Sequence, residues 1–283
     1  MTLKYLLKKP KTLFISIFTI LLITSNSFSQ SQDYGSISYN KAINISGKQR
    51  MLSQKMSKAF LLISKGIDSE EIKKELNSSK FIFEKQLDIL SKNAPSSAIK
   101  LSIKDVKKSW VKFKGVISSP PNYMNSEEVM KLNTSLLSKS HELVLSIETS
   151  SKYNNQFFKN KNQDLANTIN VSGKQRMLSQ RLCLYYTASL MFPDQKNEHK
   201  NVMNKIFDEF DSVIGDLLIN SYNTTEIEEE LGNVMATWEK FQANKKGFLN
   251  GTFSLEDVFN TTNSLTKSFN KITGVYEIIS KSL

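Results

Sequence analysis

Hydrophobic positions recur at helical spacing through most of this chain. Drawn at about 100° per residue, one side of a helix through residues 45–63 is almost entirely apolar; it carries Ile45, Gln49, Leu52, Met56, Ala59 and Ile63. A bundle helix buries a stripe of this kind against its neighbours. The 283 residues include only ten glycines and five prolines. The pattern therefore predicts long helices joined by short connections.

Breaks in the pattern divide each half of the chain into four expected helices. In the first half they fall near Gly66, Pro95 and residues 119–121; in the second half they fall near Pro193, at 222–225 and at 247–254. Asp68 with Glu71 and Asn125 with Glu128 have the spacing of helix-capping boxes. Four helices with short connections predict an up-down-up-down bundle in each half. The expected fold class is all-α, with two tandem antiparallel four-helix bundles.

A repeated phrase supports this division. The nine letters "SGKQRMLSQ" occupy Ser46–Gln54 and return unaltered 126 positions later, at Ser172–Gln180. Within the longer block "INISGKQRMLSQ" one residue in twelve differs, and "WVKF" at Trp110 corresponds to "WEKF" at Trp238. Related modules of this length indicate a tandem repeat. We expect module 1 at 34–155 and module 2 at 156–283, with each tryptophan buried in its third helix.

The junction between the modules contains no helix breaker. Neither glycine nor proline occurs from Ser126 to Ser172, and the apolar spacing stays roughly helical. This predicts one continuous helix from Ser126 to Leu190, on the order of 100 Å long at ~1.5 Å per residue. The polar stretch "NNQFFKNKNQD" leaves a break or kink as the alternative.

The first 29 residues have the three-part plan of a secretory signal peptide. Four lysines precede an apolar run from Thr12 to Ile23, and Ser27 and Ser29 follow as small residues before a cleavage site. An uncleaved anchor is the other interpretation, but the run is shorter than the ~20 residues that span a bilayer. We therefore expect export to a bacterial periplasm and no stable membrane insertion after cleavage. The four lysines account for part of the net charge of +11, and the remaining +7 is scattered rather than arranged as a nucleic-acid stripe.

The sequence contains no motif typical of an enzyme. The lone cysteine, Cys183, cannot form a disulfide within the chain, and the two histidines, His141 and His199, lack the spacing of metal ligands on one helical face. No nucleophile elbow or phosphate-binding loop occurs. The sequence predicts no enzyme, no cofactor and no metal site.

The repeated phrase carries a second, polar face beside its apolar one. Its members are Ser46, Gly47, Arg50, Ser53 and Gln54 in module 1, and Ser172, Gly173, Arg176, Ser179 and Gln180 in module 2. A glycine inside a helix costs roughly 0.5–1 kcal/mol, and close approach of another backbone is a common reason for it. An arginine binds planar oxyanions through paired hydrogen bonds, and hydroxyl and amide groups complete them. We predict that these ten residues bind a small anion where two such helices face each other.

This phrase on the first helix of a four-helix bundle resembles the motif of the PilJ-type domain. That is the N-terminal domain of type IV pili methyl-accepting chemotaxis transducers, and it is similar to the input domain of nitrate/nitrite sensor kinases. The resemblance implies nitrate-like binding by Arg50 and Arg176 between two first helices, which in the kinases belong to a dimer. It also implies a membrane-bound signalling partner, because no signalling module follows within this sequence.

Two functional hypotheses follow. One is an exported sensor module for a small anion, and the other is a structural or adaptor protein whose motif face docks a partner helix. The two motif helices can meet within one chain or between the chains of a homodimer, and a continuous junction helix would favour the second arrangement.

Overall fold

The computed structural model describes residues 33–154 and 161–282. The expected signal peptide at 1–29 lies outside these residues. The first half contains a small hairpin and four helices: β1 (Asp33–Tyr34), β2 (Ile37–Ser38), α2 (Tyr39–Ser64), α3 (Glu70–Asn93), α4 (Ser97–Ile117) and α5 (Tyr123–Asn154). The second half contains α6 (Lys161–Met191), the 3-10 turn η1 (Pro193–Gln195), α7 (Lys196–Leu218), α8 (Thr225–Gln242), the short α9 (Lys245–Asn250) and α10 (Leu255–Ile279). The all-α prediction is confirmed.

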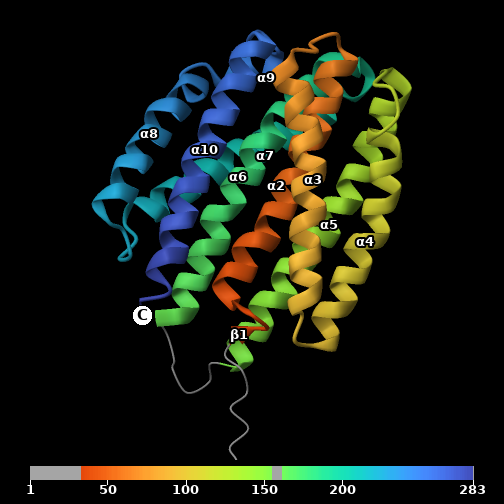
Figure 1. Cartoon of the computed structure of the whole chain (residues 1–283). Coiled ribbons are helices and arrows are strands. Elements are labelled where there is room, and N and C mark those ends of the chain that lie inside the picture. The colour runs from red at the N-terminus through yellow and green to blue at the C-terminus, as the bar shows by residue number, and fades with distance from the viewer. Residues whose placement is uncertain (1–32, 155–160, 283) are drawn as a thin grey trace, which may run out of the picture.

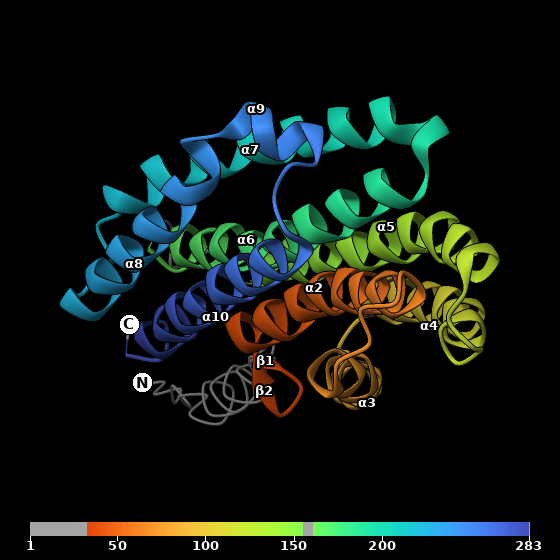
Figure 2. The same cartoon turned by 90° about the horizontal axis from the view of Figure 1, so that it is seen from above.

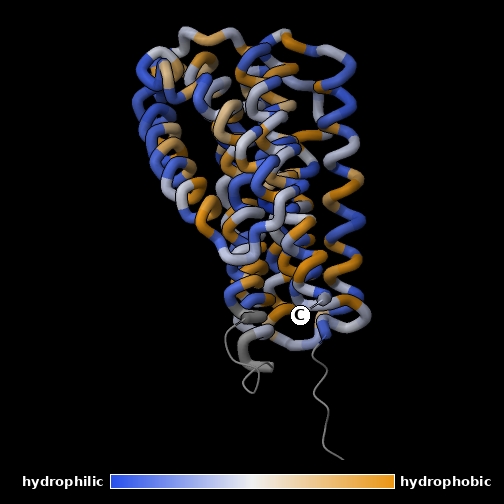
Figure 3. Tube along the Cα trace, turned by 90° about the vertical axis from the view of Figure 1, so that its left-hand side faces the viewer, coloured by the Kyte–Doolittle hydropathy of each residue, from blue (hydrophilic) through white to orange (hydrophobic). Residues whose placement is uncertain are grey.

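The helices of each half form one bundle. In the first half, α2 packs between α3 and α5, and α4 packs on α5. In the second half, α6 packs in the same way between α7 and α10, and α8 packs on α10. Apolar and polar residues alternate along the outer helices (Figure 3), as expected of amphipathic helices with one buried face.

Local side-chain bonds fix where the helices begin. Ser69 caps α3 by accepting a hydrogen bond from the backbone N–H of Ile72, and the Asn122 side chain accepts one from the N–H of Asn125 at the start of α5. Both helix starts were predicted within a few residues, but the predicted capping residues, Asp68 and Asn125, are wrong. Serine and asparagine are as favourable as aspartate at a cap, so shifts of one residue (Asp68 to Ser69) and three residues (Asn125 to Asn122) still give well-capped helices.

The two bundles lie side by side and meet through their motif helices. Helix α2 packs along α6, and these two helices occupy the centre of the molecule (Figures 1 and 2). The remaining helices of the first half lie on one side of this pair, and those of the second half lie on the other (Figure 1). The motif helices therefore meet within a single chain.

The continuous junction helix is wrong. Helix α5 ends at Asn154 and α6 begins at Lys161, while residues 155–160 lie outside the described ranges. The side chain of Asn170 on α6 donates a 3.0 Å hydrogen bond to Glu148 on α5, although the two residues are 22 positions apart. A straight helix would separate them by about 33 Å. The chain therefore reverses direction between the helices, and α6 returns antiparallel to α5.

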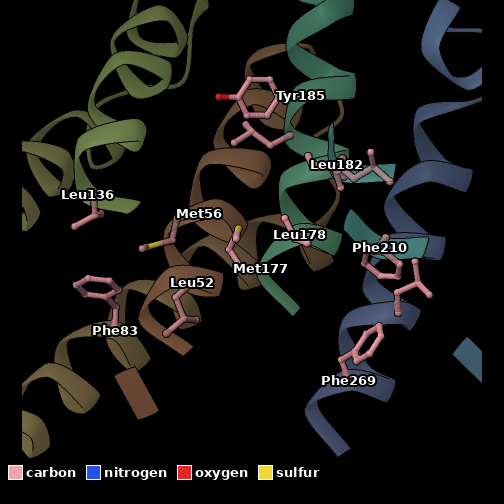
Figure 4. Close-up of a cluster of buried hydrophobic side chains, with 14 of the residues drawn as sticks. Leu52, Met56, Phe83, Leu136, Met177, Leu178, Leu182, Tyr185, Phe210 and Phe269 are labelled. Atoms are coloured by element: carbon pink, nitrogen blue, oxygen red, sulfur yellow. The ribbon is translucent and has the colours of Figure 1, made fainter. Parts of the chain in front are cut away.

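Buried side chains fill both bundles and the space between them. Figure 4 shows Leu52 and Met56 of α2 beside Met177 and Leu178 of α6, and all four are at most 5% exposed. As predicted, the tryptophans are core residues of the third helices. Trp110 stacks on Phe83 with ring centroids 4.4 Å apart, and Trp238 stacks on Phe210 at 4.5 Å. Within the described ranges, every helix is too short or too polar to span a bilayer.

Candidate functional site

Two buried arginines face each other where α2 and α6 pack together. Arg50 is 1% exposed and Arg176 is fully buried. Each side chain leaves its own motif helix and reaches the helix of the other copy. The nine-letter phrase is thus used twice to build one interface, with related contacts on the two sides.

Arg50 is held by neutral groups. Its Nη2 donates to Asn170 Oδ1 at 2.8 Å and to the Asn170 backbone carbonyl at 3.4 Å. Its Nη1 lies 3.3 Å from Nδ1 of His141, on α5. Because a guanidinium only donates hydrogen bonds, this nitrogen of His141 acts as the acceptor and the ring is neutral. The Nε of Arg50 has no partner among the described residues.

Arg176 makes the matching set of contacts. Its Nη1 donates to Asn44 Oδ1 at 2.8 Å and to Asn270 Oδ1 at 3.2 Å, and its Nη2 lies 3.5 Å from the Asn44 carbonyl. Its Nε donates to the carbonyl of Gly173 at 3.2 Å. Asn44 and Asn170 are therefore exchanged across the interface, and Asn270 of α10 stands where His141 stands in the first copy.

A carboxylate orients each of these two asparagines. Asn170 donates to Glu148 Oε2 at 3.0 Å, and Asn44 donates to Glu277 Oε2 at 2.6 Å. The amide can then present only its carbonyl oxygen to the arginine. Each arginine therefore donates to the neutral amide oxygen of an asparagine, and that asparagine in turn donates to a carboxylate.

The arginine pair carries buried charge that no carboxylate of the described residues contacts directly. Within the described residues, neither guanidinium forms an ion pair with a carboxylate. Burial lowers the pKa of Arg50 to about 10, opposed by the charge of Glu148. Burial, and then the charge of Arg50, lower the pKa of Arg176 to about 9. Both pKa values stay above neutral pH, so both side chains are charged at pH 7.

The conserved glycines of the phrase make room for this pair. A Cβ at Gly47 would lie 3.4 Å from the Nη2 atoms of both arginines, so these nitrogens are at most twice that distance, about 7 Å, apart. Two unit charges at that separation repel by about 2 kcal/mol at an effective dielectric constant of ~20. A Cβ at Gly173 would lie 2.8 Å from Nη2 of Arg176. The group that approaches these glycines is a guanidinium, not the backbone that the sequence suggested.

The other predicted site residues are buried at the same interface, but they do not point their polar groups at the arginines. Ser46, Ser53, Ser172 and Ser179 each donate to a carbonyl of their own helix. Gln54 donates to Asn133 of α5 at 2.6 Å. Gln180 donates to Asn263 and Thr266 of α10. These glutamines tie each motif helix to the last helix of its bundle.

Several contact residues were missed from the sequence, namely Asn44, Asn170, His141, Asn270, Glu148 and Glu277. The two asparagines carry a signal, because both occur in the repeated block six positions before the arginine. The other four lie outside the repeated block, and their part depends on how the helices pack. Across 33–154 and 161–282, no three His, Cys, Asp or Glu residues are grouped so as to hold a metal ion.

Two helical bundles thus meet through matching motif helices, with two buried arginines between them. The profile of the type IV pili methyl-accepting chemotaxis transducer N-terminal domain, PilJ, matches residues 36–136 and 159–254. The chain therefore belongs to the PilJ family, a family of chemotaxis sensory domains, and carries two tandem copies of the domain. No curated protein and no solved structure matches the chain.

Proposed function

We propose that this chain is a sensor module that binds one small oxyanion, of the nitrate or nitrite type, between Arg50 and Arg176. The observation that carries the proposal is the pair of buried guanidiniums with no carboxylate partner in the described structure. An anion there would relieve their mutual repulsion and replace neutral amide acceptors with charge-assisted hydrogen bonds. One chain supplies both motif helices, so the site does not require a second copy.

Binding of the anion would act on the packing of α2 against α6. The ligand stabilises whichever arrangement of the two helices brings both arginines to it, and it shifts the population towards that arrangement. Because Asn44 and Asn170 join each arginine to a carboxylate, the shift reaches Glu148 on α5 and Glu277 on α10. The last helix of each bundle is therefore the route by which we expect the signal to leave the site.

Thermal unfolding in the presence of anions tests the proposal. Nitrate and nitrite, titrated into the purified protein, should raise its melting temperature in a saturable way, with about 2.7 kcal/mol of stabilisation at one hundred times Kd. Arg50→Ala with Arg176→Ala should abolish the response. Sulfate and chloride at equal ionic strength serve as controls for general salt effects. A wild-type protein that responds to no oxyanion contradicts the proposal.

Two glycine substitutions separate site geometry from fold stability. Gly173→Ala keeps both arginines in the sequence but should weaken the anion response, because the new methyl group would lie 2.8 Å from Arg176 Nη2 and would push the guanidinium aside. Gly232→Ala, inside α8 with open space around its Cβ position, is the matched control. Both changes favour a helix by up to about 1 kcal/mol, but only Gly173→Ala should affect binding.

The adaptor hypothesis needs the motif faces to be free for a partner. In this structure the two faces cover each other, so a partner helix would have to separate α2 from α6. Loss of binding to a signalling partner on Arg50→Ala, in a protein that responds to no anion, would favour the adaptor.

Export and a partner belong to the proposal as well. Domains of this family are typically periplasmic, and residues 1–29 would direct the chain there. A membrane-bound signalling protein or a second copy of the chain would then receive the output. The mass of the protein recovered from the periplasm should correspond to cleavage after Ser29; a full-length mass would instead support the uncleaved anchor.

A further inference from the structure

A polar groove opens where α3 and α10 lie over α2. Its volume is ≈ 510 Å³, and Lys48, Lys55, Glu75, Gln86, Asn263 and Asn270 are among its lining residues. In Figure 1, α3 and α10 lie on either side of the central pair at this face. Two of its lining residues connect the groove to the arginine site: burial and the charge of Arg176 lower the pKa of Lys48, and Asn270 accepts a hydrogen bond from Arg176.

The first of these is Lys48, a half-buried cation that lines the groove. Burial lowers the pKa of Lys48 and the charge of Arg176 lowers it further, while Glu277 opposes both. Its equivalent in the second motif, Lys174, forms an ion pair with Glu209. Lys48 has no such partner in the part of the chain that the structure describes. Of the two matching lysines, the one that lines the groove therefore has no carboxylate in ion-pair contact among the described residues.

The second is Asn270, which separates the groove from Arg176. Asn270 is exposed and lines the groove, and its Oδ1 accepts the 3.2 Å hydrogen bond from Arg176 Nη1. A side chain at the protein surface therefore caps a fully buried guanidinium. Rotation of that one side chain would bring Arg176 into contact with the groove. On the other side of the pair, the exposed His141 occupies the corresponding place beside Arg50.

We propose that the anion reaches the arginine pair through this groove, that it displaces Asn270 from Arg176, and that Lys48 is a further cationic binding residue. This inference rests on the proposed function. An oxyanion at Nη1 of Arg176 takes over the hydrogen bond that a neutral amide now accepts, and it gives Lys48 an anion to pair with directly. The site is thus asymmetric, with entry at the Arg176 end, although its two arginines come from identical motifs.

Three substitutions test the route. Lys48→Gln should weaken nitrate binding by about tenfold, the loss expected for one hydrogen bond to a charged group, and should reduce the dependence of affinity on ionic strength. Lys174→Gln removes the matching lysine of the other motif and should leave affinity nearly unchanged. Asn270→Phe, at an exposed position that should tolerate it, obstructs the path and should slow both association and dissociation.

Isothermal titration calorimetry at two ionic strengths gives the affinities, and exchange broadening of the arginine Nε–H signals in NMR gives the rates. A wild-type protein that binds no oxyanion overturns the proposed function and this inference with it. Binding that depends on Arg50 and Arg176, but that Lys48→Gln and Asn270→Phe leave unchanged, overturns entry through the groove and leaves the proposed function standing. An equal loss in Lys48→Gln and Lys174→Gln would show a general effect of charge and would also overturn it.

Discussion

Glu75→Ala is expected to lower the free energy of unfolding by about 3–5 kcal/mol, the cost of leaving a buried charge without its partner. The partner is Lys58, whose side chain is fully buried and whose Nζ lies 2.7 Å from Glu75 Oε1. The same ammonium donates to Asn263 of α10 at 2.8 Å and lies 4.3 Å from the ring centroid of Phe259. Without Glu75, this cation loses its ion pair, while the positive charge of Lys55, which also contacts Glu75 at 3.3 Å, stays nearby.

The second copy provides the control. Leucine, Leu184, stands at the position that matches Lys58, so Lys58→Leu places in the first copy what the repeat already uses. The double variant Glu75→Ala with Lys58→Leu should recover most of the stability that Glu75→Ala loses, because the buried ammonium is then gone and the remaining cation, Lys55, is partly exposed to solvent. Denaturant unfolding of the wild type, Glu75→Ala, Lys58→Leu and the double variant gives the four free energies of this double-mutant cycle. A loss below about 1 kcal/mol in Glu75→Ala would show that water reaches Lys58.

Anion affinity is expected to rise as the pH falls below about 6.5, by up to about tenfold for each pH unit. The cause is His141. Burial lowers the pKa of its ring, and the positive charges of Arg50 on α2 and Lys174 on α6 lower it further, against Glu142 and Glu148 on its own helix. A bound anion offsets the charge of Arg50 and so raises the pKa of the ring again. Binding therefore takes up a proton between the lowered pKa of the free protein and the higher pKa of the complex.

The variant His141→Asn is the matched control, because asparagine already makes this contact in the second copy, at Asn270. It should bind the anion with an affinity that does not change with pH over this range. Calorimetry between pH 5 and 7.5 measures the effect, with the anion fully ionised throughout. A wild-type affinity independent of pH would contradict the role of His141.

The stability of the ligand-free protein should follow the opposite trend. A histidine whose pKa is lowered by folding binds fewer protons in the folded state, so stability falls as the pH falls through the unfolded value of ~6.5. His199, buried beside Tyr185, has a lowered pKa for the same reason and adds to this loss. The pH dependence of stability therefore reflects the protonation of both histidines, whereas the pH dependence of anion affinity should reflect only that of His141.

The repeat and the helical periodicity predict the eight long helices and the two bundles, but not the hairpin of β1 and β2, the short helix α9 or the end of α5 at Asn154. They place Trp110 and Trp238 in the core correctly, because a buried stripe depends only on spacing along one helix. They also identify a polar face that a second helix must cover. The identity of that helix depends on the chain reversal before α6, which no glycine or proline marks, and local periodicity carries no information about it.

The candidate site was predicted in part for a similar reason. Arg50 and Arg176 stand out because the repeat preserves a polar face that packing alone does not require. The groups that surround them come from four helices, and those groups become neighbours only when the bundles are docked. The serines show the limit of reasoning from residue type, since each hydroxyl is used by the carbonyls of its own helix.

Because both motif helices belong to one polypeptide, the two sides of their interface need not be identical in sequence. In a dimer of identical subunits every substitution appears on both sides of the axis at once. Here a residue on one side changes alone. Three positions differ between the two sides of the interface. His141 contacts Arg50 where Asn270 contacts Arg176, Lys48 has no ion pair where Lys174 has one, and Lys58 stands where the second copy has Leu184. Proton response, ligand entry and attachment of the two halves can thus reside at separate places around a single pair of arginines.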